Sequence, residues 1–191
     1  MSPDTVKLYE ITEGKLSSLP QVARQAIQNL GNIKIIQSDL EIERREYEES
    51  DSLRSPTFIF NLLERFGNKK CALCECEIPE LIQGAHIWPV ATIKRAPNIS
   101  QEKKLEAAID SNNGMWLCNN HHKLFDVNLI LISETGRTKC VSTLRKADKE
   151  YVRDVTITRE LPSPFLTAGF LQYLRKRNSS LEGHRFHFIG K

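Results

Sequence analysis

Apolar positions in the first third of the chain recur at helical intervals. In residues 17–31 they lie between a Ser/Pro start and a closing glycine, which predicts a helix with start and stop signals. Residues 55–67 repeat this arrangement, with Ser55 as the expected N-cap and Gly67 just beyond the last turn. The intervening pattern predicts a short strand and then a strongly charged helix, at residues 32–37 and 38–50.

Beyond residue 67 the pattern changes to short apolar runs separated by turn signals. Residues 68–132 therefore predict short strands and tight turns, with one helix at 100–110. The run VNLILIS, 127–133, is expected to return beside the preceding hairpin and to bury Leu129 and Leu131 or their neighbours. The C-terminal part predicts a strand, an amphipathic helix with a basic end and a closing strand, at residues 151–158, 163–177 and 184–190. This mixture predicts an α+β fold.

The composition is that of a globular protein. Of 191 residues, 40% are hydrophobic and 27% are charged, which is ordinary for a folded domain with one sizeable core. No internal repeat or long Gly/Ser linker divides the chain. We expect one compact unit with three parts: a helical region at 1–67, a core at 68–135 and a basic region at 136–191.

The apolar runs are too short for a membrane span, the longest clear one being residues 129–132. The N-terminal residues contain no apolar segment typical of a signal peptide. We therefore expect a cytoplasmic protein with reduced cysteines, which favours metal binding over disulfides.

The formal net charge of +3 is unevenly distributed. Residues 1–66 hold 8 Lys/Arg against 11 Asp/Glu, and residues 67–135 hold 7 against 8. Residues 136–191 hold 12 against 5, an excess of +7. Such an excess is what a phosphate-contacting surface needs, although a solvated face with surplus Lys/Arg would look the same.

Two cysteine- and histidine-bearing pairs have the spacing of zinc ligands. Each pair is separated by two residues, and 43 residues lie between the pairs. Two such turns predict one closed, structural zinc site with the ligands Cys71, Cys74, Cys118 and His121. The alternative is that the cysteines are merely small buried residues. Cys76 is close enough to be an alternate ligand, whereas Cys140 stands alone as a core or surface thiol.

The two adjacent histidines, His121 and His122, lie in a predicted helix at 117–126. Neighbouring side chains on a helix point about 100° apart, so the pair can serve two different sites. Asp126 lies four residues after His122 and therefore projects from the same face. His122 could instead replace His121 as the zinc ligand.

Two further polar residues stand out before this helix. His86 follows an apolar stretch, and Asn113 precedes Gly114. Alone, the histidine would be read as a half-buried packing residue and the Asn-Gly pair as a turn. His184 and His187, which alternate in the closing strand, are read as ordinary surface or packing residues.

Together these residues resemble the HNH nuclease superfamily, whose ββα-metal motif runs His, Asn, His. The similarity covers about residues 71–132 and is carried by AHIWP at 85–89, NG at 113–114 and LCNNHHKLFD at 117–126. The resemblance implies a zinc-stabilised ββα-metal core with flanking helices. It also identifies His86 as the general base and Asn113 as a residue that orients the base or helps to hold the metal and the hairpin.

The resemblance further implies that His122 and Asp126 bind a catalytic divalent cation, Mg²⁺, Mn²⁺ or another transition ion. Many family members carry Asp or His immediately before the base as a metal ligand. Here that position is Ala85, which has no ligand atom. The chain therefore lacks one metal ligand that many family members have.

The flanking segments look like those of bacterial HNH restriction endonucleases. This similarity implies a type II restriction enzyme that cuts double-stranded DNA as a homodimer, with DNA contacts and a dimer surface from the N-terminal helices and the basic C-terminal part. A phage, homing or repair nuclease that nicks DNA is the alternative enzyme. An inactive, zinc-stabilised DNA-binding module, favoured by Ala85, is the alternative from another class.

Overall fold

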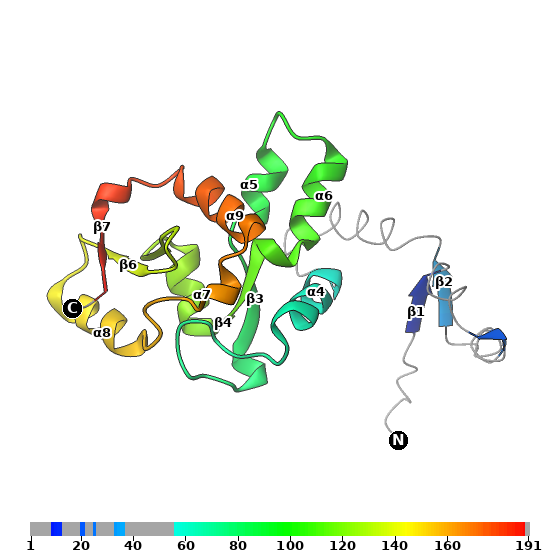
Figure 1. Ribbon diagram of the computed structural model, residues 1–191, viewed down its shortest axis with the longest axis horizontal. Coiled ribbons are helices and arrows are strands. Elements are labelled where there is room, and N and C mark those ends of the chain that lie inside the picture. The colour runs from blue at the N-terminus through cyan, green and yellow to red at the C-terminus, as the bar shows by residue number, and fades with distance from the viewer. Residues whose placement is uncertain (1–8, 13–19, 22–24, 26–32, 37–55, 190–191) are drawn as a thin grey trace, which may run out of the picture. The chain divides into compact units, whose positions relative to one another are not determined.

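The computed structural model describes residues 9–12, 20–21, 25, 33–36 and 56–189 (Figure 1). The chain divides into two compact units, residues 1–52 and 53–191. In the first, β1 (Tyr9–Thr12) and β2 (Ile33–Ile36) form a two-stranded parallel sheet. The β2 strand lies where 32–37 was predicted, whereas the helix predicted at 38–50 and most of the one at 17–31 lie outside the described residues.

The second unit mixes helices with two small antiparallel sheets, so the α+β prediction is confirmed. Its helices are α4 (Pro56–Phe66), α5 (Val90–Arg95), α6 (Gln101–Ile109), α7 (Asn119–Asp126), α8 (Lys146–Val155) and α9 (Ala168–Asn178). Its strands are β3 (Ile82–His86), β4 (Gly114–Cys118), β5 (Ile130–Ile132), β6 (Thr138–Val141) and β7 (Phe186–Phe188). Single 3₁₀ turns are η1 (Pro79–Leu81), η2 (Ser111–Asn113), η3 (Ser163–Phe165) and η4 (Gly183–Arg185).

The β3–β4 hairpin is the centre of this unit, with α4 and α7 on opposite sides of it (Figure 1). Gly84 and Gly114 allow α4 to come close to the hairpin. A Cβ at Gly84 would lie 2.8 Å from Leu62, and one at Gly114 would lie 2.5 Å from Phe58. Gly114 has an extended backbone with φ −149°, so this glycine is explained by close approach and not by a left-handed turn.

The main core joins the hairpin to the helices around it. Its largest fully buried side chains include Phe58, Ile87, Met115, Phe125 and Phe170, which come from α4, the end of β3, β4, α7 and α9. The other sheet, in the order β5–β6–β7, packs Ile130 and Ile132 into the same core. Its opposite face buries Leu131 in a small cluster with Val141 and Phe186.

The strand predicted at 151–158 is wrong, because α8 covers Lys146–Val155. The prediction used the alternation of apolar and polar residues from Tyr151 onwards. It did not include residues 146–150, which favour a helix. In the helix that forms, Val152 and Val155 lie on one face and pack against the core. The chain becomes extended only after Thr156, where the Thr158 amide donates to the Leu73 carbonyl.

Other boundaries follow local capping. Helix α4 ends at Phe66, and Gly67 follows it as predicted, with φ +68° and an amide that donates to the Leu63 carbonyl. Helix α9 begins later than residue 163, because the Thr167 hydroxyl caps it by accepting from the Phe170 amide. Strand β5 pairs with β6, and Ile130 and Ile132 pack into the core that includes the β3–β4 hairpin. The short helix α5 was not predicted.

Among the described residues, no helix is both long and apolar enough to cross a membrane.

Candidate active site and metal centre

Four of the predicted ligands converge at one end of the β3–β4 hairpin. Cys71 and Cys74 lie in the turn that precedes β3, where the Cys71 amide donates to the Cys76 carbonyl. Cys118 ends β4 and His121 occupies the first turn of α7. The ligand atoms of these four residues all lie within 4.8 Å of one another.

The distances within this cluster fit a tetrahedral zinc ion. The Cys74 and Cys118 sulfurs are 3.8 Å apart, and His121 Nδ1 lies 3.5 Å from Cys71 Sγ and 3.2 Å from Cys118 Sγ. Ordinary zinc bond lengths and tetrahedral angles give about 3.8 Å between two sulfurs and about 3.5 Å between sulfur and nitrogen. The cluster could therefore hold a metal such as zinc, and Cys76 and Cys140 are not part of it.

The surroundings of the cluster suit metal ligands. His121 is 1% exposed, and burial lowers its pKa to about 4, so the imidazole stays neutral. Because Nδ1 faces the sulfurs, Nε2 carries the proton and donates to the Thr156 hydroxyl at 3.2 Å. Burial raises the pKa of the Cys71 and Cys74 thiols. A bound metal would have to displace these protons, which makes its affinity dependent on pH.

His122 points to a different place from its neighbour. Its Nδ1 lies 3.2 Å from Gln83 Oε1 on β3, and its Nε2 lies 3.4 Å from Asp126 Oδ2. The Gln83 amide in turn donates to Asn119 Oδ1 at 2.7 Å. The His122 and Asp126 side chains are 18% and 51% exposed, so a solvent-borne ion or substrate has access to them.

The His86 ring is held between α4 and α6. It stacks on Phe58 with ring centroids 3.8 Å apart, and its Nε2 donates to the Ala108 carbonyl at 2.8 Å. Because a carbonyl only accepts, this contact leaves Nδ1 with the lone pair. Burial and, more weakly, the nearby charge of His122 lower the pKa of His86 to about 4 against the opposing effect of the Ala108 bond. The imidazole is therefore a neutral base at physiological pH.

A family model described as HNH endonuclease matches residues 71–133. This segment is an HNH domain. No curated protein matches the chain. The match supports a metal-dependent nuclease with DNA as its substrate, as the resemblance implied.

Within the HNH domain, Asn113 is fully buried and all its side-chain bonds are to the protein backbone. Its Oδ1 accepts from the Trp88 amide at 2.7 Å. Its Nδ2 donates to the carbonyls of Trp88 and Ala107, at 3.1 and 2.9 Å. This geometry ties the segment after His86 to α6. Of the two roles implied for Asn113, holding the hairpin and its neighbours fits these contacts.

Ala85 is fully buried on the face of the hairpin that meets α7. Residues alternate between faces along a strand, so Gln83 is on the same face as Ala85, whereas His86 is on the α4 face with Gly84. Gln83 therefore places its amide oxygen next to His122. It does so from the hairpin face of Ala85, the position at which many HNH proteins carry a metal ligand. Sequence reasoning missed Gln83, although this two-residue alternation was a signal that could have found it.

Phe58 and Arg177 were also missed. Phe58 stacks on His86 from outside the HNH domain, and Arg177 reaches the domain from α9. Neither has a motif or a fixed spacing to the HNH residues, so the sequence held no signal for them.

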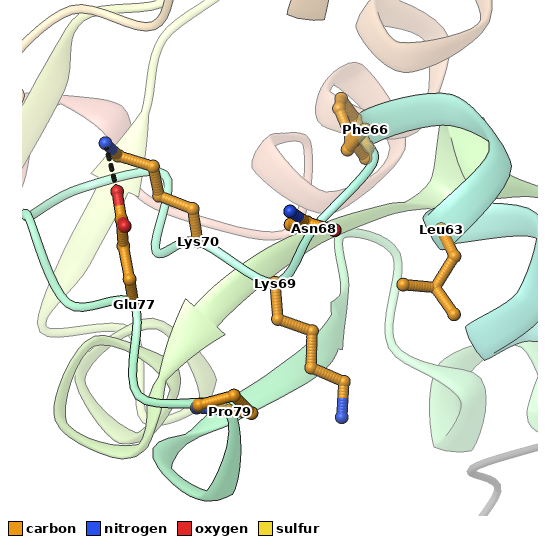
Figure 2. A pocket seen from close by; sticks show the side chains of 7 residues that line it. All are labelled: Leu63, Phe66, Asn68, Lys69, Lys70, Glu77 and Pro79. Atoms are coloured by element: carbon orange, nitrogen blue, oxygen red, sulfur yellow. Dashed lines mark ion pairs between the residues drawn. The ribbon is translucent and has the colours of Figure 1, made fainter.

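A pocket opens between the end of α4 and the segment leading into β3 (Figure 2). Lys70 and Glu77 form an exposed ion pair across it at 2.6 Å. None of the predicted catalytic residues lines it. Its lining residues are Leu63, Phe66, Asn68, Lys69, Lys70, Glu77 and Pro79.

Proposed function

We propose that this protein is a metal-dependent DNA endonuclease of the type II restriction class. The observation that carries the proposal is the pairing, within an HNH domain, of a neutral, oriented His86 with the solvent-accessible His122–Asp126 pair. A base and a cation-binding pair are what phosphodiester hydrolysis requires.

His86 acts as the general base. With Nε2 engaged by Ala108, its Nδ1 accepts a proton from the attacking water. Phe58 and Ala108 fix the plane and the rotation of the ring, which keeps this nitrogen in one direction. Asn113 is a positioning residue in this proposal, because it holds the backbone that follows His86.

His122 and Asp126 bind the catalytic cation, Mg²⁺, Mn²⁺ or another divalent ion, which when bound supplies positive charge to the scissile phosphate and the leaving oxygen. Gln83 supports this role, because its Oε1 accepts from His122 Nδ1 and so leaves Nε2 as the ligand atom beside Asp126. The Cys71, Cys74, Cys118 and His121 cluster binds a structural zinc ion, since four protein ligands leave no open position.

The regions outside the core complete the enzyme in this proposal. Residues 136–191, with their +7 charge, contact DNA phosphates. Residues 1–67 supply further DNA contacts and a two-fold dimer surface, because one site per chain cuts both strands of a palindrome only as a pair. Sedimentation of the protein with and without DNA tests the dimer.

The experiment is cleavage of supercoiled plasmid by the full chain with Mg²⁺ or Mn²⁺, followed by sequencing of the DNA ends. We expect linear products with one sequence at their ends, and loss of cleavage in His86→Ala. The matched control is His184→Ala, which removes an exposed histidine outside the HNH domain and should leave cleavage unchanged. Nicked circles alone would favour the phage, homing or repair type of enzyme.

One observation favours a second candidate, an inactive zinc-stabilised DNA-binding module. Ala85 removes a ligand that many HNH nucleases carry. This candidate requires DNA binding that is retained without any cleavage under either metal. Divalent metal binding that is abolished by His122→Ala argues against it, because an inactive module has no need of that site.

A further inference from the structure

Helix α9 lies beyond the matched HNH segment and yet contacts it at two places. At its N-terminal end, the Thr167 hydroxyl donates to Asn112 at 2.8 Å, and Gly169 packs against the same side chain. At its C-terminal end, Lys176 lies 4.4 Å from the centre of the Trp88 ring. The helix therefore reaches the segments next to Asn113 and His86.

Arg177, near the end of α9, joins two catalytic segments with a single side chain. Its Nη1 donates to the Ile87 carbonyl at 3.2 Å, immediately after His86. Its Nη2 donates to the Phe125 carbonyl, immediately before Asp126, and to Asn128 Oδ1 at 2.7 Å. The guanidinium also stacks on the Phe125 ring, 3.8 Å from its centre.

The burial of Arg177 makes these bonds specific. The side chain is only 3% exposed, and burying a cation is costly unless it is hydrogen-bonded. Both Nη atoms are bonded, whereas Nε has no hydrogen-bond partner. Burial lowers the pKa of Arg177 to about 10, against the opposing effect of Asp126, so it remains charged at physiological pH. A surface arginine would tolerate many substitutions. The buried Arg177 bonds two carbonyls at once, and this depends on the planar, forked shape of its guanidinium group.

We propose that Arg177 is a positioning residue that sets the separation between the base and the metal-binding pair of the nuclease. It ties the residue after His86 to the last turn of α7, which carries Asp126 one turn after His122. The inference rests on the proposed function, since it assigns a purpose to a contact with those residues. It also makes the C-terminal region part of the catalytic unit and not an appended DNA-binding segment.

Arg177→Lys tests this proposal, because it keeps the charge but replaces the planar fork with a single ammonium group. The zinc-loaded protein should keep its zinc and bind DNA with nearly unchanged affinity. Its single-turnover cleavage rate at saturating DNA should fall by roughly 10- to 100-fold, the cost of displacing reacting groups by about 1 Å. The matched control is Arg95→Lys, at an exposed position at the end of α5 and outside the regions proposed to contact DNA. That variant should cut at the wild-type rate.

A milder variant, Asn128→Gly, removes one partner of Arg177 and preserves the backbone, because Asn128 has φ +57° and glycine adopts this conformation freely. It should lower the cleavage rate in the same direction but by less. If both variants cut at the wild-type rate per folded molecule, Arg177 has only a structural role and the proposal is overturned.

Imidazole NMR signals of the DNA-free protein separate this inference from the proposed function. Arg177→Lys should move the signals of His86 and His122 and leave that of the exposed His184 in place. Unmoved His86 and His122 signals overturn the role of Arg177, whether or not the protein cuts DNA. A wild-type protein that never cuts DNA but shows these shifts refutes the nuclease proposal alone.

Discussion

Replacing Gly114 with Ala should lower both stability and cleavage, because the added methyl group meets a side chain that has no room to move. The new Cβ would lie 2.5 Å from Phe58 Cζ, whereas ordinary contacts begin at 3.4 Å. Phe58 must therefore shift by about 1 Å, and it is completely buried. Overpacking of this kind costs about 1–3 kcal/mol of unfolding free energy.

The effect should reach the base through the ring stack. Phe58 lies 3.8 Å from His86, so displacing one ring displaces the other. We expect a fall in single-turnover cleavage of up to about 100-fold, as for other displacements of about 1 Å. Urea unfolding measures the stability change and plasmid cleavage at saturating DNA measures the rate.

The matched control is Gly183→Ala, whose added Cβ would have no atom within 4 Å. Adding Phe58→Leu to Gly114→Ala should recover part of the lost stability, because the smaller side chain relieves the contact. The reasoning is refuted if Gly114→Ala is as stable as Gly183→Ala. It is also refuted if the changes in unfolding free energy caused by Gly114→Ala and Phe58→Leu simply add in the double variant.

Three more outcomes are expected. His121→Ala should shed zinc and lose thermal stability, whereas His122→Ala should keep its zinc and fold but cut DNA orders of magnitude more slowly; metal analysis and plasmid cleavage would expose swapped roles. Leu131→Asp should unfold the second unit, since Leu131 is 5% exposed between Val141 and Phe186, and a stable variant in circular dichroism would contradict this. The pKa of His86 is about 4 in the folded protein against 6.5 when unfolded, so its contribution to stability is full above pH 6.5 and is lost as pH falls towards 4. The stability difference between wild type and His86→Gln should therefore shrink over that range in pH-dependent urea unfolding, and a constant difference would speak against it.

The metal cluster was predictable because its ligands come in two pairs, each confined to one tight turn. The two-residue spacing within each pair makes its two side chains converge. The fold then only has to bring the two turns together. The separate directions of His121 and His122 likewise followed from the geometry of one helix. The HNH resemblance then indicated where His86 would lie.

What sequence reasoning missed depends on contacts between distant segments. Nothing near Arg177 indicates that its side chain ends between Ile87 and Phe125. The Asn-Gly pair at 113–114 was open to a plain reading as a turn, yet Gly114 is extended and its importance comes from the approach of α4. The strand predicted at 151–158 was wrong for a local reason. The prediction considered only residues from Tyr151 onwards and not residues 146–150, in which α8 begins.

The metal cluster takes two ligands from each side of a long internal segment. Cys71 and Cys74 precede the connection between α5 and α6, in which Pro97 and Asn98 are exposed, and Cys118 and His121 follow it. The strands β3 and β4 are divided between the same two halves. A single cut in the connection at 96–99 would therefore give two fragments that one zinc ion and one hairpin hold together. His86 would lie on one fragment and Asn113, His122 and Asp126 on the other. If the proposed function holds, we expect the two separate polypeptides to cut DNA only when they assemble around the metal.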